Sequence, residues 1–157
     1  MASDSDAVSL LNDPSIIWLD EPLANIDIDL AAILFRDRNR PHMDAAFAIS
    51  LFGGKANGRV AHANLVLGIA AGLCLRHYGD DTKIHELDRI KLSEPFCPGD
   101  KIGVRITEIS HKERGGQCYI AAEIEIFRRR GDEVVAATPK KKVLCDLTHP
   151  VRSETKK

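Results

Sequence analysis

An apolar stretch from Ala61 to Tyr78 is the strongest feature in the pattern of hydrophobic and polar residues along the chain. Its central part, Leu65–Leu75, has no charged residue, and in a helix its apolar side chains would cover every side. Such a helix is normally buried, and the stretch is too short for a bilayer, which needs about 20 residues. Gly68 and Gly72 lie one turn apart, where each glycine costs about 1 kcal/mol relative to alanine. We therefore expect a central core helix, covered on most sides, with another backbone close to these glycines.

Two shorter helices are expected before this core helix. Asp27 or Asp29 can cap the first, over Leu30–Phe35, which should stop near Asp37. Three apolar residues share one face of that helix: Leu30, Ile33 and Leu34. The second helix fits Asp44–Phe52 with Asp44 as its cap, and a loop rich in glycine then leads into the core helix.

After Gly79 the chain changes from helical to extended periodicity. The last extended segment is interrupted at Pro139, which suggests an edge or a bulge, and Gly131-Asp132 forms a hairpin. The segments expected as strands are Ser15–Leu19, Thr82–Leu92, Lys101–Ile109, Gln117–Phe127 and Glu133–Leu144. The best alternation places four residues on an inward face: Ile120, Ala122, Ile124 and Ile126. Helices followed by a meander of about four antiparallel strands predict an α+β fold, a curved sheet around one helix.

The composition supports one domain of 157 residues, with residues 1–14 and 152–157 expected to be flexible. Charged residues make up 29% of the chain and the net charge is −1, so nothing favours nucleic acid as a partner. The N-terminus lacks the basic and apolar parts of a signal peptide, which favours a cytoplasmic protein. The cysteines lie far apart without a CxxC pair, so we expect buried thiols in a reducing compartment and no zinc site.

The residues that suggest chemistry lie in the polar segment Phe35–Asp44, which holds Asp37, Asn39 and His42. A histidine beside a carboxylate is the usual minimum for general acid–base catalysis near neutral pH. By spacing alone, a helix-end charge and a cap-region histidine are the commoner explanation, because Asp-x4-His is a loose pattern. The context favours function, since the core helix begins after Val60–Asn64 and its N-terminal N–H groups can hold a developing oxyanion.

These ordered motifs resemble the MaoC-like, (R)-specific enoyl-CoA hydratases and dehydratases, over roughly residues 24–145. The family's Asp-x-Asn-x-x-His pattern and its Asp-x-x-Phe-Ala helix start resemble Asp37–His42 and Asp44–Ala48. The stretch that opens the family's central helix resembles Val60–Ala63, and a later turn resembles Pro95–Asp100. The resemblance implies the hot-dog fold, in which an antiparallel sheet wraps around one long helix.

The resemblance also implies which residues form the catalytic and substrate-binding site. Asp37 and His42 match the catalytic pair that adds water to C3 of an enoyl thioester, with Asn39 orienting the loop. The backbone N–H of Ala63 would polarise the thioester carbonyl. Further substrate contacts are expected from His62, Asn64, Gly58 and Phe47. No metal or redox cofactor is implied, and coenzyme A or acyl carrier protein enters as part of the substrate. A homodimer, or a higher homo-oligomer, is implied, with the acyl pocket near the interface and no membrane partner.

Three departures from the family pattern bear on rate and substrate. The proline follows Arg40 instead of Asn39, Ala63 replaces a glycine, and Ala71 stands where some members have serine. They keep one alternative open, a non-catalytic acyl-thioester-binding subunit. A second alternative is a hot-dog acyl-CoA thioesterase, since thioesterases of this fold also use a carboxylate and the end of the central helix to direct water.

Other conspicuous residues have simpler interpretations. His62 is more readily a capping or packing residue than a second base, and Cys74 belongs to the core. Arg128–Arg130 and Lys140–Lys142 are interpreted as solvated charge runs, with contact to coenzyme A phosphates as the less favoured alternative.

Overall fold

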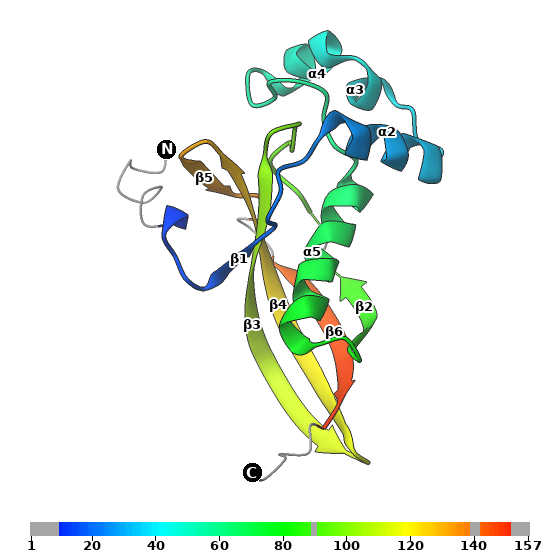
Figure 1. Ribbon diagram of the computed structural model, residues 1–157, viewed down its shortest axis with the longest axis vertical. Coiled ribbons are helices and arrows are strands. Elements are labelled where there is room, and N and C mark those ends of the chain that lie inside the picture. Colours follow the sequence, from blue (N-terminus) through cyan, green and yellow to red (C-terminus); the bar gives the residue numbers. More distant parts are fainter. Residues whose placement is uncertain (1–9, 89–90, 139–141, 152–157) are drawn as a thin grey trace.

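The computed structural model describes residues 10–88, 91–138 and 142–151. Within them, a curved antiparallel sheet of six strands packs against one long helix, α5 (Ala63–Tyr78) (Figure 1). The strands are β1 (Ile16–Trp18), β2 (Lys83–Asp88), β3 (Lys101–Arg114), β4 (Gln117–Arg130), β5 (Glu133–Ala136) and β6 (Val143–Pro150). Their order is β1-β3-β4-β6-β2, and β5 pairs with the end of β4. The predicted α+β class is confirmed.

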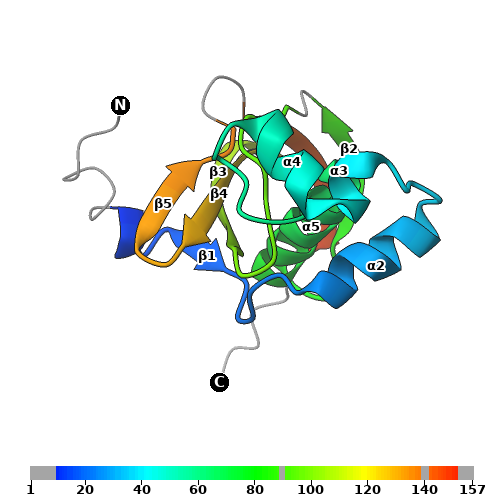
Figure 2. The ribbon, with the colours of Figure 1, turned by 90° about the horizontal axis from the view of Figure 1, so that it is seen from above.

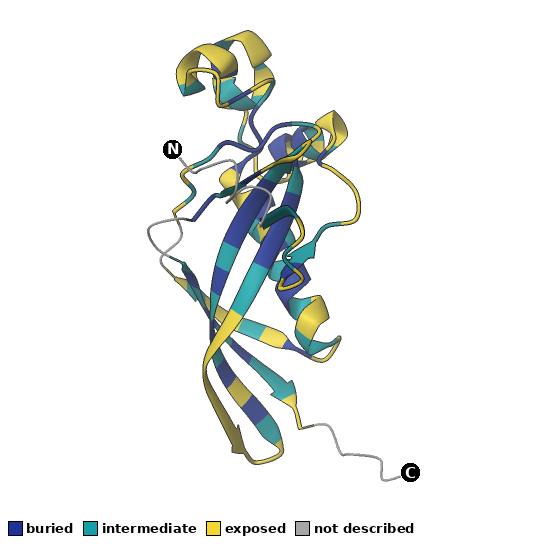
Figure 3. Cartoon of the chain, turned by 90° about the vertical axis from the view of Figure 1, so that its left-hand side faces the viewer, coloured by how far each residue is buried: buried dark blue, intermediate teal, exposed yellow. Residues whose placement is uncertain are grey.

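The core forms between the alternating face of β4 and one side of α5. The four β4 residues predicted to face inwards are at most 3% exposed: Ile120, Ala122, Ile124 and Ile126. They belong to one cluster with the buried helix residues Val66, Ala70, Leu73 and Cys74. The buried residues of the long strands lie mainly in the part of the sheet beside α5, whereas the far half of β3 is exposed (Figure 3). The period of two in β4 therefore predicted the core face correctly.

The helix itself is less covered than expected. Only one side of α5 is buried, and Gly68 is exposed. A Cβ atom added at Gly68 or Gly72 would meet nothing within 4 Å. Within the described part of the chain, the predicted close approach of another backbone is therefore wrong, because the sheet covers one face of the helix alone.

Three short helices lie over the N-terminal end of α5: α2 (Asn25–Leu34), α3 (Arg40–Met43) and α4 (Ala45–Phe52) (Figure 2). The Asp44 cap of α4 was predicted correctly, and its carboxylate accepts the Phe47 N–H at 2.9 Å. Helix α2 begins earlier than predicted. Its N-cap is Ala24, whose N–H donates to the Asp27 carboxylate at 2.7 Å, so neither aspartate occupies the N-cap position.

The apolar face predicted for the first helix exists but points outwards. Leu30, Ile33 and Leu34 are 51%, 58% and 74% exposed. The buried face of α2 is made instead by smaller residues and one isoleucine: Ile28, Ala31 and Ala32. The spacing therefore predicted which residues share a face but not the direction in which that face points.

The strand pairing also corrects the sequence expectation. The predicted strand Glu133–Leu144 is two strands: β5, and β6, which extends to Pro150. Pro139 lies outside the described residues. Strand β2 pairs with β6 at an edge and not with β3, so the sheet is not a simple meander. These pairings join segments far apart in sequence, which local periodicity does not reveal.

The burial of individual residues tests further predictions about the N-terminal segment, the arginine run and the cysteines. In the segment expected to be flexible up to Pro14, Leu10 and Leu11 pack against the cluster of Ile16, Phe127 and Val134. Arg128 was predicted to be solvated, but it is 3% exposed and forms ion pairs with Glu94 and Glu133.

All four cysteines are buried, and none forms a disulfide within the described chain. No helix in these ranges is long and apolar enough to cross a membrane.

Candidate active site

The loop between α2 and α3 carries Asp37. It turns sharply at Arg36, whose φ of 56° lies in the left-handed region. One oxygen of the Asp37 carboxylate accepts the Asn39 N–H at 3.1 Å, and Asn39 is the N-cap of α3. This local bond closes an Asx-type turn and leaves the other carboxylate oxygen, Oδ2, to face His42. The geometry therefore fixes Asp37 through the chain on both sides of it.

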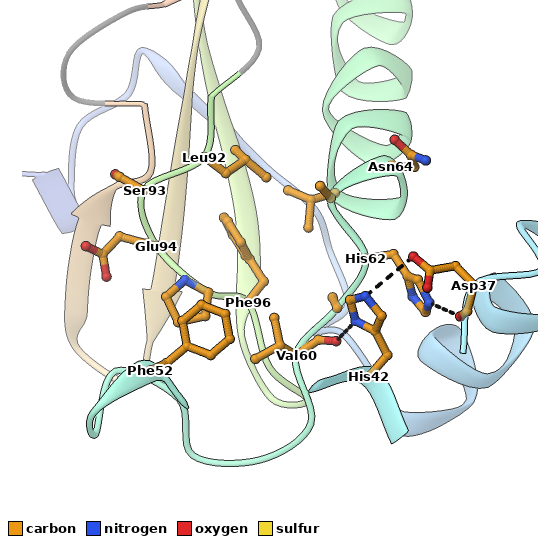
Figure 4. Close-up of a pocket in the computed structure, with 14 residues that line it drawn as sticks. Asp37, His42, Phe52, Val60, His62, Asn64, Leu92, Ser93, Glu94 and Phe96 are labelled. Carbon is orange, nitrogen blue, oxygen red and sulfur yellow. Dashed lines mark hydrogen bonds and ion pairs between the residues drawn. The ribbon is translucent and has the colours of Figure 1, made fainter. Parts of the chain in front are cut away.

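His42 is held in one orientation by a backbone carbonyl (Figure 4). Its Nδ1 lies 2.7 Å from the carbonyl oxygen of Val60, and since a carbonyl only accepts, Nδ1 carries the proton. The Val60 N–H in turn donates to the carbonyl of Pro41 at 3.0 Å, which ties the two segments together. In neutral His42, Nε2 then carries a lone pair, and it lies 3.6 Å from Asp37 Oδ2. Two acceptors at this separation suit one water that donates a hydrogen to each.

His62 contacts both Asp37 and His42. It sits at the N-cap of α5, is 2% exposed, and makes no side-chain capping bond. Its Nε2 donates to the Asp37 backbone carbonyl at 2.8 Å. Its ring stacks on the His42 ring, with centroids 3.8 Å apart. The expectation of a packing residue fits this contact, and the ring fixes both members of the pair.

The N-terminus of α5 forms the adjacent wall. Ala63 and Asn64 are its first residues, and the first N–H groups of a helix have no intrahelical acceptor. The helix dipole adds positive potential at the same place. The Ala61 N–H donates to the Phe96 carbonyl at 2.7 Å, which fixes the approach to the helix. A developing negative charge on a substrate oxygen would therefore be stabilised beside Ala63.

A cavity of about 330 Å³ joins these groups. Five of the residues predicted from sequence line it: Asp37, His42, His62, Ala63 and Asn64. The remaining lining residues are Phe52, Val60, Ala61, Val66, Leu92, Ser93, Glu94, Pro95 and Phe96. One end of the cavity thus holds the acid–base pair and the helix N-terminus, and the other is mainly apolar.

Three predicted site residues lie outside the cavity lining. The Asn39 side chain is exposed, and only its backbone N–H reaches Asp37. The Arg40 guanidinium lies over the Phe47 ring, with its Cζ atom 4.5 Å from the ring centroid. Gly58 lies beside Pro98, and its carbonyl accepts the Cys97 thiol at 3.9 Å.

Sequence reasoning did not identify the apolar wall. Pro95 and Phe96 belong to the Pro95–Asp100 turn, so that motif was the available signal. Asp100 is fully buried and accepts the Cys97 N–H at 2.8 Å and two Arg130 N–H groups at 2.7 Å each. The carboxylate of Asp100 also raises the pKa of Arg130. This network fixes the turn that brings Phe96 into the cavity.

Donor atoms of Asp37, His42 and His62 lie within 4.8 Å of one another, a spacing that a divalent cation can also use. One ring nitrogen of each histidine is bonded to a backbone carbonyl, which fixes both rings and leaves the other nitrogen of each without a proton in the neutral ring.

Comparison with known proteins places the fold. No family model matches the sequence, and no curated protein sequence matches it significantly. Among solved structures, it is similar to the (R)-hydratase PhaJ1 from Pseudomonas aeruginosa (TM-score 0.65, 19% identity, 87% of this chain and 81% of that chain).

It is also similar to the (R)-hydratase from A. caviae involved in PHA biosynthesis (TM-score 0.61, 15% identity, 87% and 94% coverage). A conserved hypothetical protein from Mycobacterium tuberculosis, described as a double hotdog fold, gives a TM-score of 0.68 at 14% identity, over 90% of this chain and 43% of that chain. At such identities the likeness shows the fold alone: the chain has the hot-dog fold.

Proposed function

We propose that this protein is an (R)-specific enoyl-thioester hydratase that also acts as a 3-hydroxyacyl-thioester dehydratase. The observation that carries the proposal is the pair formed by Asp37 Oδ2 and His42 Nε2, 3.6 Å apart, in a cavity that also contains the N-terminus of α5. The similar structures named as (R)-hydratases support the reaction class and the product configuration. Coenzyme A or acyl carrier protein enters as the carrier of the acyl group.

In the hydration direction, a water donates its hydrogens to Asp37 and His42, which orients its oxygen towards C3 of the enoyl group. The thioester carbonyl accepts the Ala63 N–H, so the negative charge that forms on this oxygen is stabilised. As the new C–O bond forms, the catalytic pair takes one proton from water. The pair then passes this proton to C2, and the enolate becomes a 3-hydroxyacyl thioester. Dehydration is the same sequence in reverse.

The test is the loss of the ultraviolet band of the enoyl thioester with crotonyl-CoA and with a longer enoyl-CoA. We expect the wild type to consume both substrates or one of them and to form the (R)-3-hydroxy product. Asp37→Asn and His42→Ala should each lower kcat about 100- to 10,000-fold, because general acid–base catalysis contributes on that order. Circular dichroism should show an unchanged fold.

Asp20→Asn is the matched control, because Asp20 is exposed and lies outside the cavity lining. An active Asp37→Asn, His42→Ala double variant would overturn the assignment. Release of free thiol from a saturated acyl-CoA without loss of the enoyl band would instead favour the thioesterase. Saturable acyl-CoA binding without turnover would favour the non-catalytic subunit.

A further inference from the structure

A second cluster of chemically active side chains lies far from the cavity, on the long β3–β4 hairpin that extends past the C-terminal end of α5 (Figure 1). His111 and Glu113 are on β3, and Cys118 is on β4 directly opposite Glu113. Because side chains alternate along a strand, these three share one face, while Lys112 and Arg114 lie on the other. The hairpin therefore gathers an imidazole, a carboxylate and a thiol.

The donor atoms are close enough to share one ion. Those of His111, Glu113 and Cys118 all lie within 4.8 Å of one another. Glu113 Oε1 is 3.9 Å from His111 Nε2 and 3.9 Å from Cys118 Sγ, which donates to it. A metal ion would replace that thiol proton and draw the three donors together by small side-chain rotations.

A fourth residue, Glu108, lies beside the other ring nitrogen of the histidine. Glu108 Oε2 lies 3.6 Å from His111 Nδ1, and His111 Nε2 points to the other two donors. A carboxylate behind the non-ligating nitrogen is the usual outer partner of a metal-bound histidine, since it fixes the ring and its tautomer.

We propose that His111, Glu113 and Cys118 bind Zn²⁺ through three protein ligands, with water in the fourth position. Thiolate, imidazole and carboxylate are the donors that zinc prefers in proteins. Cys118 is 3% exposed, whereas the side chains of His111 and Glu113 are 44% and 62% exposed, so an ion can enter from solvent. The bound ion would join the two strands near the end of the hairpin.

The sequence expectation of no zinc site rested on the absence of a CxxC pair. Here the ligands come from two strands joined through Gly115 and Gly116, which both have positive φ. Strand pairing, and not close spacing of cysteines, brings the donors together. The proposal is independent of the proposed hydratase reaction.

The test is cobalt binding to the metal-free full-length protein, followed by displacement with zinc. We expect one equivalent of Co²⁺ to produce a thiolate charge-transfer band that one equivalent of Zn²⁺ removes. Cys118→Ser should abolish the band, and His111→Ala should weaken zinc affinity at least tenfold. Glu108→Gln should weaken it about 10- to 100-fold, as expected for loss of an outer partner.

Cys97→Ser and His85→Ala are matched controls and should leave the band and the affinity unchanged. The thiolate band also separates this site from the Asp37–His42–His62 group, which contains no cysteine. The proposal fails if the wild type shows no such band, or if the band persists in Cys118→Ser. Because His111 is exposed, its variant tests the site even if Cys118→Ser does not fold.

Discussion

His62 connects the two parts of the candidate site at the scale of single residues. Its ring lies against His42, and its Nε2 holds the backbone carbonyl of Asp37. It therefore positions both Asp37 and His42. Its Nδ1 is buried and has no hydrogen-bond partner among the described residues.

We predict that His62→Ala lowers kcat about 100-fold and changes KM much less, because a misplacement near 1 Å costs on that order. His62→Phe keeps a stacking ring but loses the bond to Asp37, and it should recover part of kcat. Steady-state kinetics with the substrate accepted by the wild type measures both values. An unchanged kcat in His62→Ala would contradict the positioning role.

The sequence indicated this site only in part, for a physical reason. Asp37 and His42 could be found because the ordered motifs around them resemble a family pattern, whereas their spacing alone is loose. The Val60 carbonyl that orients His42 could not be found, because every residue has a backbone carbonyl. The role of His62 depends on a stacked contact between two segments, and no local pattern encodes that contact.

At the scale of elements, the cap of α4 links the sequence directly to the site. The Asp44 carboxylate accepts the Phe47 N–H, and Arg40 Nε donates to its other oxygen at 3.1 Å. These two interactions lower the pKa of Asp44 from its ordinary value of 3.8. Arg40 belongs to the same short helix as His42, so this carboxylate ties α3 to α4.

We predict that Asp44→Ala lowers the urea midpoint of unfolding at about pH 6 and that its difference from wild type shrinks in acid. A carboxyl with a lowered folded pKa stabilises fully above its unfolded pKa, near 3.8, and loses this effect as pH falls through the lower folded value. Urea unfolding at a series of pH values measures the difference. Asp20→Ala, which caps no helix, is the control, and a difference that grows in acid would contradict the prediction.

Local signals succeeded where one element determines its own structure. The Asp44 cap, the alternation in β4 and the apolar run of α5 each needed only neighbouring residues. The pairing of β2 with β6 and the separation of β5 from β6 needed contacts between distant segments. The outward apolar face of α2 shows the same limit, since the periodicity identifies a face but not what covers it.

At the scale of the whole molecule, the uncovered side of α5 must be explained. Gly68, Ala71 and Gly72 lie on one stripe of this helix, and the large exposed residues of α2 add further apolar surface. Glycine in a helix interior is costly unless something uses the space, and nothing among the described residues does. A second copy packed on α5 would explain both the glycines and the exposed surface.

We therefore predict a homodimer in which α5 of each copy contributes to the interface. Gly68→Leu should raise the dimer dissociation constant at least tenfold, because its side chain would occupy the space reserved for the partner. The folded monomer should persist, since a Cβ at this position meets no described atom of the same chain within 4 Å.

Sedimentation velocity over a range of concentrations measures the association, and Arg114→Leu, at an exposed position on β3 outside α5, is the control. A wild type that stays monomeric, or a Gly68→Leu dimer of unchanged affinity, would contradict the prediction. Because Ala63 and Asn64 lie at the start of the same helix, loss of the dimer should also lower activity at the cavity. If the variant is monomeric and fully active, the glycine stripe serves assembly alone and one chain forms the complete site.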